Sequence, residues 1–395
     1  MPSPNRCPGV LHALACRDGM LVRVRVPGGL ITLEQTTALA ELARKQGDAF
    51  LDLTARANVQ LRGIQEDALP KVADALAAIG LLPSARHDRV RNIFAGPFVG
   101  IDPQELFDVR PLVRAFDAGL LGDPRFARLP AKFSVAFDGG ASRAQACAGT
   151  DLALQAVTST HGTRLHLAIG DTPTGLGCKP EDGAQIMLQA TRAALAYADT
   201  ANLSTARAWR LHRFPDAAAH VRTSLAARLE PCPAPQRKEP GGLPLGVFPA
   251  NVSARINIVP LVPLGRLSAR QANGIAAIVR RCNGEIRLAP RSVVLGLMPR
   301  AALAEIRSDL QRLGLRLDGS SGFAGIVACS GLAGCTKALA DVRGDAVRIA
   351  ERIAALRLFG TTLNLAACEK RCAMPAGADI ELVATGAGYD IRVNV

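Results

Sequence analysis

One pattern occurs twice along the 395 residues, and this repeat constrains the fold more than any other feature of the chain. In the first copy, an alternating segment at 21–26 precedes a helical pattern after Thr32, and a second alternating segment at 54–62 precedes a helical pattern over 66–79. In the second copy, strands are predicted over 254–265 and 285–295, and helices after Ser268 and over 301–313. The shift between the copies is about 235 residues. The repeat predicts a duplicated α+β protein with a pseudo-twofold axis.

Local signals support the two copies. Thr32 with Gln35, and Ser268 with Gln271, have the spacing of a capping box, which favours a helix start at the same place in each copy. Segment 54–62 alternates strictly over nine residues, so we expect one strand there. Its polar face contains no acidic residue and consists of Thr54, Arg56, Asn58, Gln60 and Arg62.

The corresponding face of the second copy is apolar. Val293 and Leu295 stand where the first copy has Asn58 and Gln60, although Arg291 falls opposite Arg56. We therefore expect only the first copy to have kept a polar working face.

A longer α/β segment follows each small unit, and a Pro- and Gly-rich stretch lies between the halves. We expect a first half-domain at 10–85, a first large domain with a helical extension at 88–230 and a linker at 231–246. The second half-domain is expected at 247–317 and the second large domain at 318–395.

The second large segment contains two cysteine pairs. Cys329 and Cys335 have C-x5-C spacing, and after 32 residues Cys368 and Cys372 have C-x3-C spacing. Four thiolates from two loops suit an iron–sulfur cubane, in which each iron takes one protein ligand. The competing readings are a zinc site, for which five intervening residues is wide, and four inert buried cysteines.

A helix could bring the second cysteine loop back beside the first. Between the pairs, apolar residues recur at helical spacing, at Leu339, Val342, Val347, Ile349, Ile353 and Leu356.

The other six cysteines show no pair spacing and are interpreted as structural or incidental: Cys7, Cys16, Cys147, Cys178, Cys232 and Cys282. Ten unevenly spaced cysteines in a chain of this length indicate a reduced compartment rather than a disulfide framework. No apolar run approaches a membrane span and the N-terminus lacks a hydrophobic signal core, so we expect a soluble cytoplasmic protein.

The net charge of +13 calls for an anionic partner. Nucleic acid is disfavoured, because the 15 aromatic residues do not interleave with basic runs. An anionic small molecule or an acidic protein explains the charge equally well. The six histidines form no ligand spacing, and no residue stands out as a general base.

Together, the duplication, the polar strand and the paired cysteines resemble the sulfite and nitrite reductase superfamily. Within it, the chain is similar to the precorrin-3B synthase family in its short length and in segments 91–93, 129–133, 137–140 and 388–391. The resemblance implies two ferredoxin-like half-domains and two larger α/β domains around a pseudo-twofold axis. It also implies O₂-dependent hydroxylation of precorrin-3A, with closure of a γ-lactone, in aerobic cobalamin biosynthesis.

The resemblance implies cofactors and a substrate site as well. A 4Fe–4S cluster would be held by Cys329, Cys335, Cys368 and Cys372, with a non-haem iron and an electron donor in addition. The many carboxylates of the tetrapyrrole call for a cleft lined with basic and amide groups. The candidate lining is Arg23, Arg25, Arg56, Asn58, Gln60, Arg62, Arg91, Asn92 and Lys132.

Three positions depart from the family pattern. Arg371 stands where a glycine often precedes the last cysteine, and Asn364 stands where a histidine is common. Ser134 replaces the second of two lysines found in sulfite-reducing members, which argues against sulfite reduction. The alternatives are a sirohaem-dependent sulfite or nitrite reductase and a non-catalytic tetrapyrrole- or cluster-binding protein.

Overall fold

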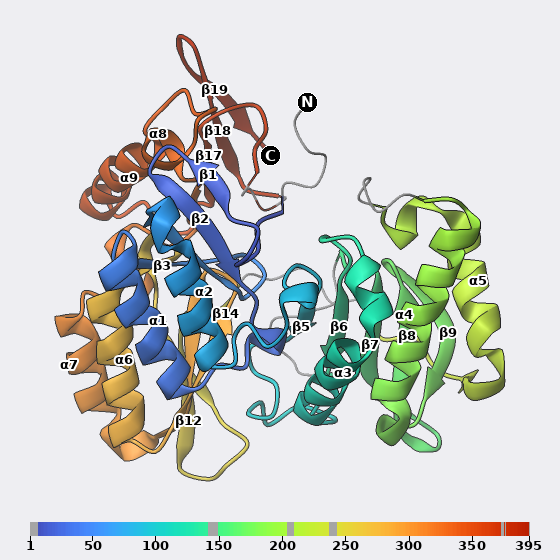
Figure 1. Cartoon of the computed structure of the whole chain (residues 1–395). Helices are drawn as coiled ribbons and strands as arrows, with labels where there is room; N and C mark the ends of the chain where they lie inside the picture. Colours follow the sequence, from blue (N-terminus) through green and yellow to red (C-terminus); the bar gives the residue numbers. More distant parts are fainter. Residues whose placement is uncertain are drawn as a thin grey trace.

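The computed structural model describes residues 7–140, 149–203, 209–236, 243–372, 375 and 377–394 (Figure 1). Cys147 and part of the expected linker lie outside these residues. Within the described ranges, no helix combines the length and the apolar character that a membrane-spanning segment needs.

The two copies of the repeated unit form one structural body with two sheets. The first copy contributes strands β1 (Leu14–Cys16), β2 (Gly19–Val24), β3 (Phe50–Leu53) and β4 (Val59–Ile64), with helices α1 (Leu33–Gln46) and α2 (Leu69–Ala78). The second contributes β11 (Gly246–Pro249), β12 (Arg255–Val259), β13 (Arg266–Ser268), β14 (Glu285–Ala289) and β15 (Ser292–Pro299), with α6 (Ala269–Arg281) and α7 (Leu303–Arg312).

Each copy contributes a backbone segment that pairs with the sheet of the other copy. Strand β13 of the second copy pairs with β3 to extend the first sheet, in the order β1-β2-β4-β3-β13. In the reverse sense, Leu30 of the first copy forms an antiparallel bridge to Arg287 of β14. The apolar side chains of both copies join in one hydrophobic core, so the two half-domains are not separate folding bodies.

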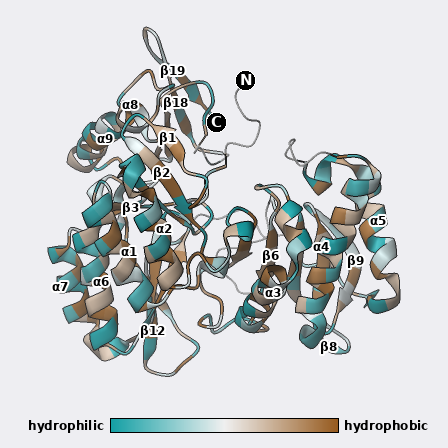
Figure 2. Cartoon of the chain, viewed as in Figure 1, coloured by the Kyte–Doolittle hydropathy of each residue, from teal (hydrophilic) through white to brown (hydrophobic). Residues whose placement is uncertain are grey.

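The helix starts follow the predicted local signals. Both capping boxes are present: Thr32 Oγ1 accepts from Gln35 N, and Ser268 Oγ accepts from Gln271 N. The two glutamine side chains also make equivalent tertiary bonds, each donating from Nε2 at 3.0 Å to the backbone oxygen of Ile79 or Leu313. Helices α6 and α7 lie beside α1 and carry mixed hydrophilic and hydrophobic residues (Figures 1 and 2). The prediction of equivalent helices is confirmed.

The predicted strands at 54–62 and 285–295 were wrong in one respect, because each contains a turn. In the first copy, residues 54–58 connect β3 to β4, and the backbone has a positive φ of 51° at Ala57. In the second copy the turn lies between β14 and β15, with a positive φ of 55° at Arg291. In the first copy, alternation of side chains continues through the turn, so the period alone could not reveal it.

The first large domain is a six-stranded sheet packed against helices. Its strands are β5 (Ile93–Ala95), β6 (Val135–Asp138), β7 (Leu152–Ser159), β8 (Gly162–Ile169), β9 (Thr172–Cys178) and β10 (Glu230–Pro231), in the order β10-β9-β8-β7-β6-β5. Strands β5, β6 and β7 are parallel, and the others are antiparallel. The helices are α3 (Arg110–Gly122), α4 (Gly183–Thr200) and α5 (Pro215–Leu225).

The second large domain repeats this topology on a smaller scale. Strands β16 (Ile326–Ala328), β17 (Leu363–Ala366) and β18 (Ile380–Thr385) are parallel, and β19 (Gly388–Val393) is antiparallel to β18. The short helix α8 (Gly331–Gly334) and the longer α9 (Val342–Leu356) connect β16 to β17, as α3 connects β5 to β6. The pseudo-twofold relation therefore extends to the large domains.

Helix α9 is present where it was predicted, but its buried face differs from the predicted apolar stripe. Leu339 before the helix and Val347 and Leu356 within it are exposed, while the helix buries Val342, Ala346 and Ala350. Small alanines face the sheet because α9 packs closely on β16 and β17.

Candidate functional site

Both cysteine loops emerge at the same edge of the second large domain. Cys329 directly follows β16, and Cys368 lies just after β17. Because β16 and β17 are parallel neighbours, their carboxyl ends meet at one edge of the sheet, where open α/β sheets commonly bind ligands. The loops are also bonded to each other, since Ala367 N donates to Cys329 Sγ at 3.3 Å and Leu339 N donates to Ala367 O at 2.8 Å.

The four thiols share one electrostatic environment. The pKa of the Cys372 thiol is raised, first by burial and then by the neighbouring Cys368, with Cys335 and Cys329 contributing in the same direction. Among the described residues, no three His, Cys, Asp or Glu side chains are arranged to hold a single metal ion. In a cubane each cysteine binds a different iron, so its ligands stand farther apart than those of one zinc ion. Four thiols from two loops at one sheet edge are the donor set that a 4Fe–4S cluster takes.

Arg371 and Asn364 both have structural partners beside these loops. Arg371 has a positive φ of 46°, a backbone region that favours glycine, and its side chain forms an ion pair with the buried Glu381. Asn364 is buried in β17 and donates from Nδ2 to Pro375 O at 3.0 Å, which ties the second cysteine loop to the sheet.

Four members of the predicted substrate lining keep polar groups available for a ligand. Arg56 and Lys132 are exposed, and among the described residues Lys132 has no hydrogen-bond or ion-pair partner. Arg56 lies over the ring of Phe94, with its guanidinium carbon 5.4 Å from the ring centroid. Arg23 and Gln60 are cross-strand partners on β2 and β4, and the amide oxygen of Gln60 accepts from Arg23.

The basic groups of this set lie around one point of the molecule. Desolvation by the surrounding protein lowers the pKa values of Arg23, Arg25 and Arg56, and the neighbouring charge of Arg56 lowers that of Arg23 further. For Arg25 the pKa falls to about 10, with the neighbouring Arg23 as the second cause. Such a cluster of desolvated cations is stabilised when an anion binds to it.

Three predicted lining residues support the site from within the protein. Arg25 is 2% exposed and donates from Nε to Asn92 Oδ1 at 2.9 Å. Asn92 in turn donates to the backbone oxygens on both sides of Lys132, those of Ala131 at 3.1 Å and Phe133 at 2.9 Å. Asn58 accepts from Val26 N at 2.8 Å and so holds the turn that carries Arg56.

Two of the predicted lining arginines have carboxylate partners from other segments. Arg62 is paired with Asp18 at 2.8 Å, and Arg91 is paired with Asp117 of α3 at 2.7 Å. Both partners are distant in sequence from their arginines, so the strand pattern contained no sign of them.

Strand β4 and the turn before it contact both large domains. Arg56 in the turn contacts Phe94 of β5, whereas Arg62 near the other end donates from Nη2 to Gly334 O, in the Cys335 loop, at 2.7 Å. Gln60 lies between them on the same face as Arg62. The turn and strand that carry the cationic side chains therefore contact β5 at one end and the Cys335 loop at the other.

Sequence reasoning singled out neither Arg210 nor Glu105. Arg210 influences Arg56 electrostatically but is itself buried and bonded to Asp151 at 2.9 Å. Glu105 lies in the β5–α3 loop, the pseudo-twofold counterpart of the Cys329 loop, and burial raises its pKa to about 7. No local motif marks either residue, because both depend on packing between distant segments.

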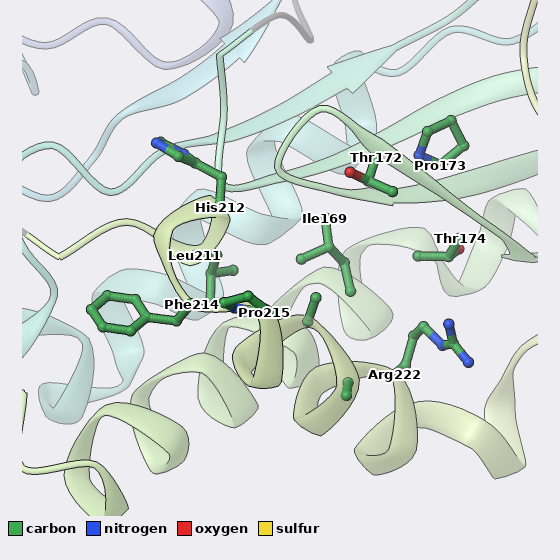
Figure 3. A pocket seen from close by; sticks show the side chains of 11 residues that line it. Ile169, Thr172, Pro173, Thr174, Leu211, His212, Phe214, Pro215 and Arg222 are labelled. Carbon is green, nitrogen blue, oxygen red and sulfur yellow. The ribbon is translucent and has the colours of Figure 1, made fainter.

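A separate hollow of about 300 Å³ lies in the first large domain, between α5 and the β8–β9 turn (Figure 3). Ile169, Thr172, Leu211, His212, Phe214 and Arg222 contribute to its lining. None of the predicted cluster or substrate residues borders it.

Known proteins show the same organisation. The family model described as "Nitrite/Sulfite reductase ferredoxin-like half domain" matches residues 15–79. The family model described as "Nitrite and sulphite reductase 4Fe-4S domain" matches residues 86–227. The second match covers the first large domain, not the one that contains the paired cysteines.

Relatives that align over most of the chain include a precorrin-3B synthase, ferredoxin–nitrite reductases and a sulfite reductase from Mycolicibacterium paratuberculosis, which is 26% identical over 92% of this chain and 69% of its own length. A precorrin-3B synthase from Sinorhizobium sp. is 29% identical over 98% of this chain and 82% of its own length. A ferredoxin–nitrite reductase from Synechococcus elongatus is 27% identical over 92% of this chain and 76% of its own length. The solved structure of Mycobacterium tuberculosis NirA protein covers 95% of this chain, and this chain covers 74% of it, with a TM-score of 0.76 and 21% identity.

The fold and its duplication define an internally duplicated protein of the α+β class. The two domain descriptions together cover more than half of the chain, which belongs to the nitrite and sulfite reductase superfamily.

Proposed function

We propose that the protein is a precorrin-3B synthase-type monooxygenase. It hydroxylates a meso carbon of precorrin-3A with O₂, and a ring acetate closes a γ-lactone. One oxygen atom enters the product, and the other leaves as water with two electrons and two protons from a donor. Nine described cysteines are free, which supports action in a reducing compartment such as the cytoplasm.

The observation that carries the proposal is the segment formed by β4 and the turn before it, which contacts both large domains. It joins the exposed Arg56 and the Arg23–Gln60 pair to the loop that contains Cys335. A flat polyanionic macrocycle needs cations along one side, and an electron-transfer centre must lie nearby. The full-length similarity to a precorrin-3B synthase favours a tetrapyrrole as the substrate rather than as a permanent cofactor.

Each set of residues has a distinct part in this proposal. Cys329, Cys335, Cys368 and Cys372 would hold a 4Fe–4S cluster, which when bound would pass single electrons from the donor. Arg23, Arg56, Gln60 and Lys132 bind substrate carboxylates. Arg25, Asn58 and Asn92 hold the turn and strand ends that carry Arg56 and Lys132.

The alternative is a sirohaem-dependent sulfite or nitrite reductase, favoured by the comparable similarity to ferredoxin–nitrite reductases. Ser134, at the second lysine position, is buried, so it places no cation toward a bound oxyanion. This supports the hydroxylase over sulfite reduction and leaves nitrite reduction as the competing reaction.

Anaerobic purification followed by iron, sulfide and sirohaem analysis separates the two reactions. The proposal expects cluster absorbance without sirohaem, then O₂ uptake with precorrin-3A and a product heavier by one oxygen atom. Tightly bound sirohaem with nitrite turnover would select the reductase. Cys368→Ala should lose iron and turnover together, and hydroxylation by an iron-free variant would contradict the role of the cluster.

Arg56 can be tested through its charge. Arg56→Ala should weaken precorrin-3A binding more at low salt than at high salt, because salt screens exposed charges. Arg44→Ala, which removes an exposed arginine paired with Glu41 on α1, is the matched control. The affinity for precorrin-3A is measured at several salt concentrations in the parent protein and in both variants. An equal loss of affinity in Arg56→Ala at every concentration would exclude a direct carboxylate contact.

A further inference from the structure

Arg62 makes a set of contacts that substrate binding does not explain. Its side chain is only 5% exposed. Nε donates to Asp18 Oδ2 at 2.8 Å and Nη2 to Asp18 Oδ1 at 2.9 Å, which is a bidentate pair. The same Nη2 donates to Gly334 O at 2.7 Å. With Nε and Nη2 engaged and only 5% of its side chain exposed, Arg62 is placed to support the protein rather than to meet a carboxylate of the substrate.

The contact with Gly334 is unusually close. A Cβ atom at position 334 would clash with Nη2 of Arg62, so only glycine allows the guanidinium to approach the backbone here. Gly334 directly precedes Cys335, whose N–H donates to Gly331 O at 2.9 Å. The guanidinium therefore rests against the peptide that leads into a predicted cluster ligand.

A second arginine contacts the same loop from the same hairpin. Arg17, between β1 and β2, donates to Leu332 O at 3.3 Å but is exposed. The β1–β2 turn thus supplies both Arg17 and Asp18, and Asp18 in turn orients Arg62. The first half-domain therefore contacts the Cys335 loop at two points, through the buried Arg62 and the exposed Arg17.

We propose that Arg62 is a positioning residue for the Cys335 loop rather than a substrate ligand. It holds the Gly334–Cys335 peptide in place and fixes a positive charge beside Cys335. A cation next to a cluster favours the reduced form, which carries the more negative charge, and so raises the reduction potential. This inference rests on the cluster proposed above.

Three full-length variants separate positioning from a general structural role. Arg62→Gln removes the charge, Arg62→Lys keeps the charge but cannot contact Asp18 and Gly334 in the same forked geometry, and Asp18→Asn leaves the arginine charge less neutralised. Arg44→Gln on the exposed face of α1 is the control.

Spectroscopic redox titration measures the reduction potential of the cluster, which should shift in opposite directions in Arg62→Gln and Asp18→Asn. Arg62→Gln should lower the reduction potential by about 59 mV, which is about a tenfold decrease in the equilibrium constant for one-electron reduction. Asp18→Asn should raise it, and Arg62→Lys and Arg44→Gln should stay near the parent protein. Equal potentials in the parent protein, Arg62→Gln and Asp18→Asn would overturn the electrostatic role.

Amide hydrogen exchange over 331–336 tests the positioning role without relying on the cluster. In iron-free protein, Arg62→Gln and Arg62→Lys should both exchange faster there than the parent and the Arg44→Gln control. Unchanged exchange would overturn the positioning role. A parent protein that binds no cluster would refute the proposed cofactor, yet the exchange comparison would still decide whether Arg62 holds the loop.

Discussion

The arginines on and beside β4 differ in how far their side chains are buried. Arg56 is exposed and stacked on Phe94, so its charge remains available to a ligand. Arg62 and Arg91 are buried, and each is bound by an aspartate from another segment. A buried guanidinium needs acceptors for its donors, and these aspartates supply both acceptors and compensating charge. A basic strand face can therefore contain both ligand-binding and structural residues.

Arg371 combines backbone strain with a partly buried ion pair. Arg371→Gly should relieve the strain of the positive φ but leave the buried Glu381 without its cation. The second effect is larger, and we expect a loss of about 1–2 kcal/mol in the free energy of unfolding. Glu381→Gln in the glycine background should recover that loss. Chemical denaturation of the three proteins measures this, and a glycine variant more stable than the parent would contradict the importance of the pair.

Glu105 should make stability depend on pH near neutrality. Burial raises its pKa from 4.5 to about 7, so between these values the folded state holds a proton that the unfolded state has released. The free energy of unfolding should therefore fall as pH rises from about 4.5 to 7, and Glu105→Gln should remove that part of the slope. Urea unfolding at several pH values tests this. Parallel profiles for the two proteins would show that Glu105 is not the responsible group.

At the scale of elements, equivalent helices in the two halves begin and end with the same kinds of residues. Helices α1 and α6 begin with equivalent capping boxes and end with basic residues in the last turn, which complement the helix dipole. The hairpins β3–β4 and β14–β15 differ, because the turn of the first is longer and carries Arg56 outward. The element that differs between the copies is the one with the proposed binding function.

The equivalence of the caps can be measured. Thr32→Ala and Ser268→Ala should each lower the free energy of unfolding by about 1 kcal/mol, because each leaves a helix N–H without its acceptor. Thr200→Ala, at the exposed end of α4, is the matched control and should change stability by less than about 0.5 kcal/mol. Thermal or urea unfolding provides the comparison, and cap variants no less stable than the control would contradict it.

At the scale of the whole molecule, Asp52 links three parts of the chain. It lies on β3 and bonds Arg266 of β13 at 2.8 Å and Arg343 of α9 at 2.9 Å. Burial opposes ionisation of Asp52, but the two arginines outweigh it and lower its pKa. A single carboxylate thus connects the first half-domain, the second half-domain and the second large domain.

Loss of this carboxylate should loosen the assembly of the domains. Asp52→Asn should cost about 3 kcal/mol, because it leaves two partly buried guanidiniums without their shared anion. Asp48→Asn, which removes only one contact of Arg266, should cost less. Since the folded pKa of Asp52 lies below 3.8, its contribution is present at higher pH and is lost as pH falls through the folded value. Urea unfolding checks the ranking, and equal costs for the two variants would contradict it.

The sequence by itself determined the features that depend on neighbours along the chain. The repeat, the helix starts at Thr32 and Ser268 and the helix between the cysteine pairs are all present in the structure. Capping and amphipathic periodicity act over a few residues, so their signals can be read locally. The cysteine spacing likewise places both pairs in loops of one domain.

Tertiary structure decided which polar side chains are available. The exchange of β13 between sheets, the partners of Arg62 and Arg91, and the contact of Arg62 with Gly334 all join residues far apart in sequence. The role of an arginine depends on its burial and on the carboxylates that the fold brings to it, and neither is encoded in the alternation of a strand. Burial and carboxylate partners therefore distinguish the arginines that stabilise the fold from the proposed substrate residues Arg56 and Lys132.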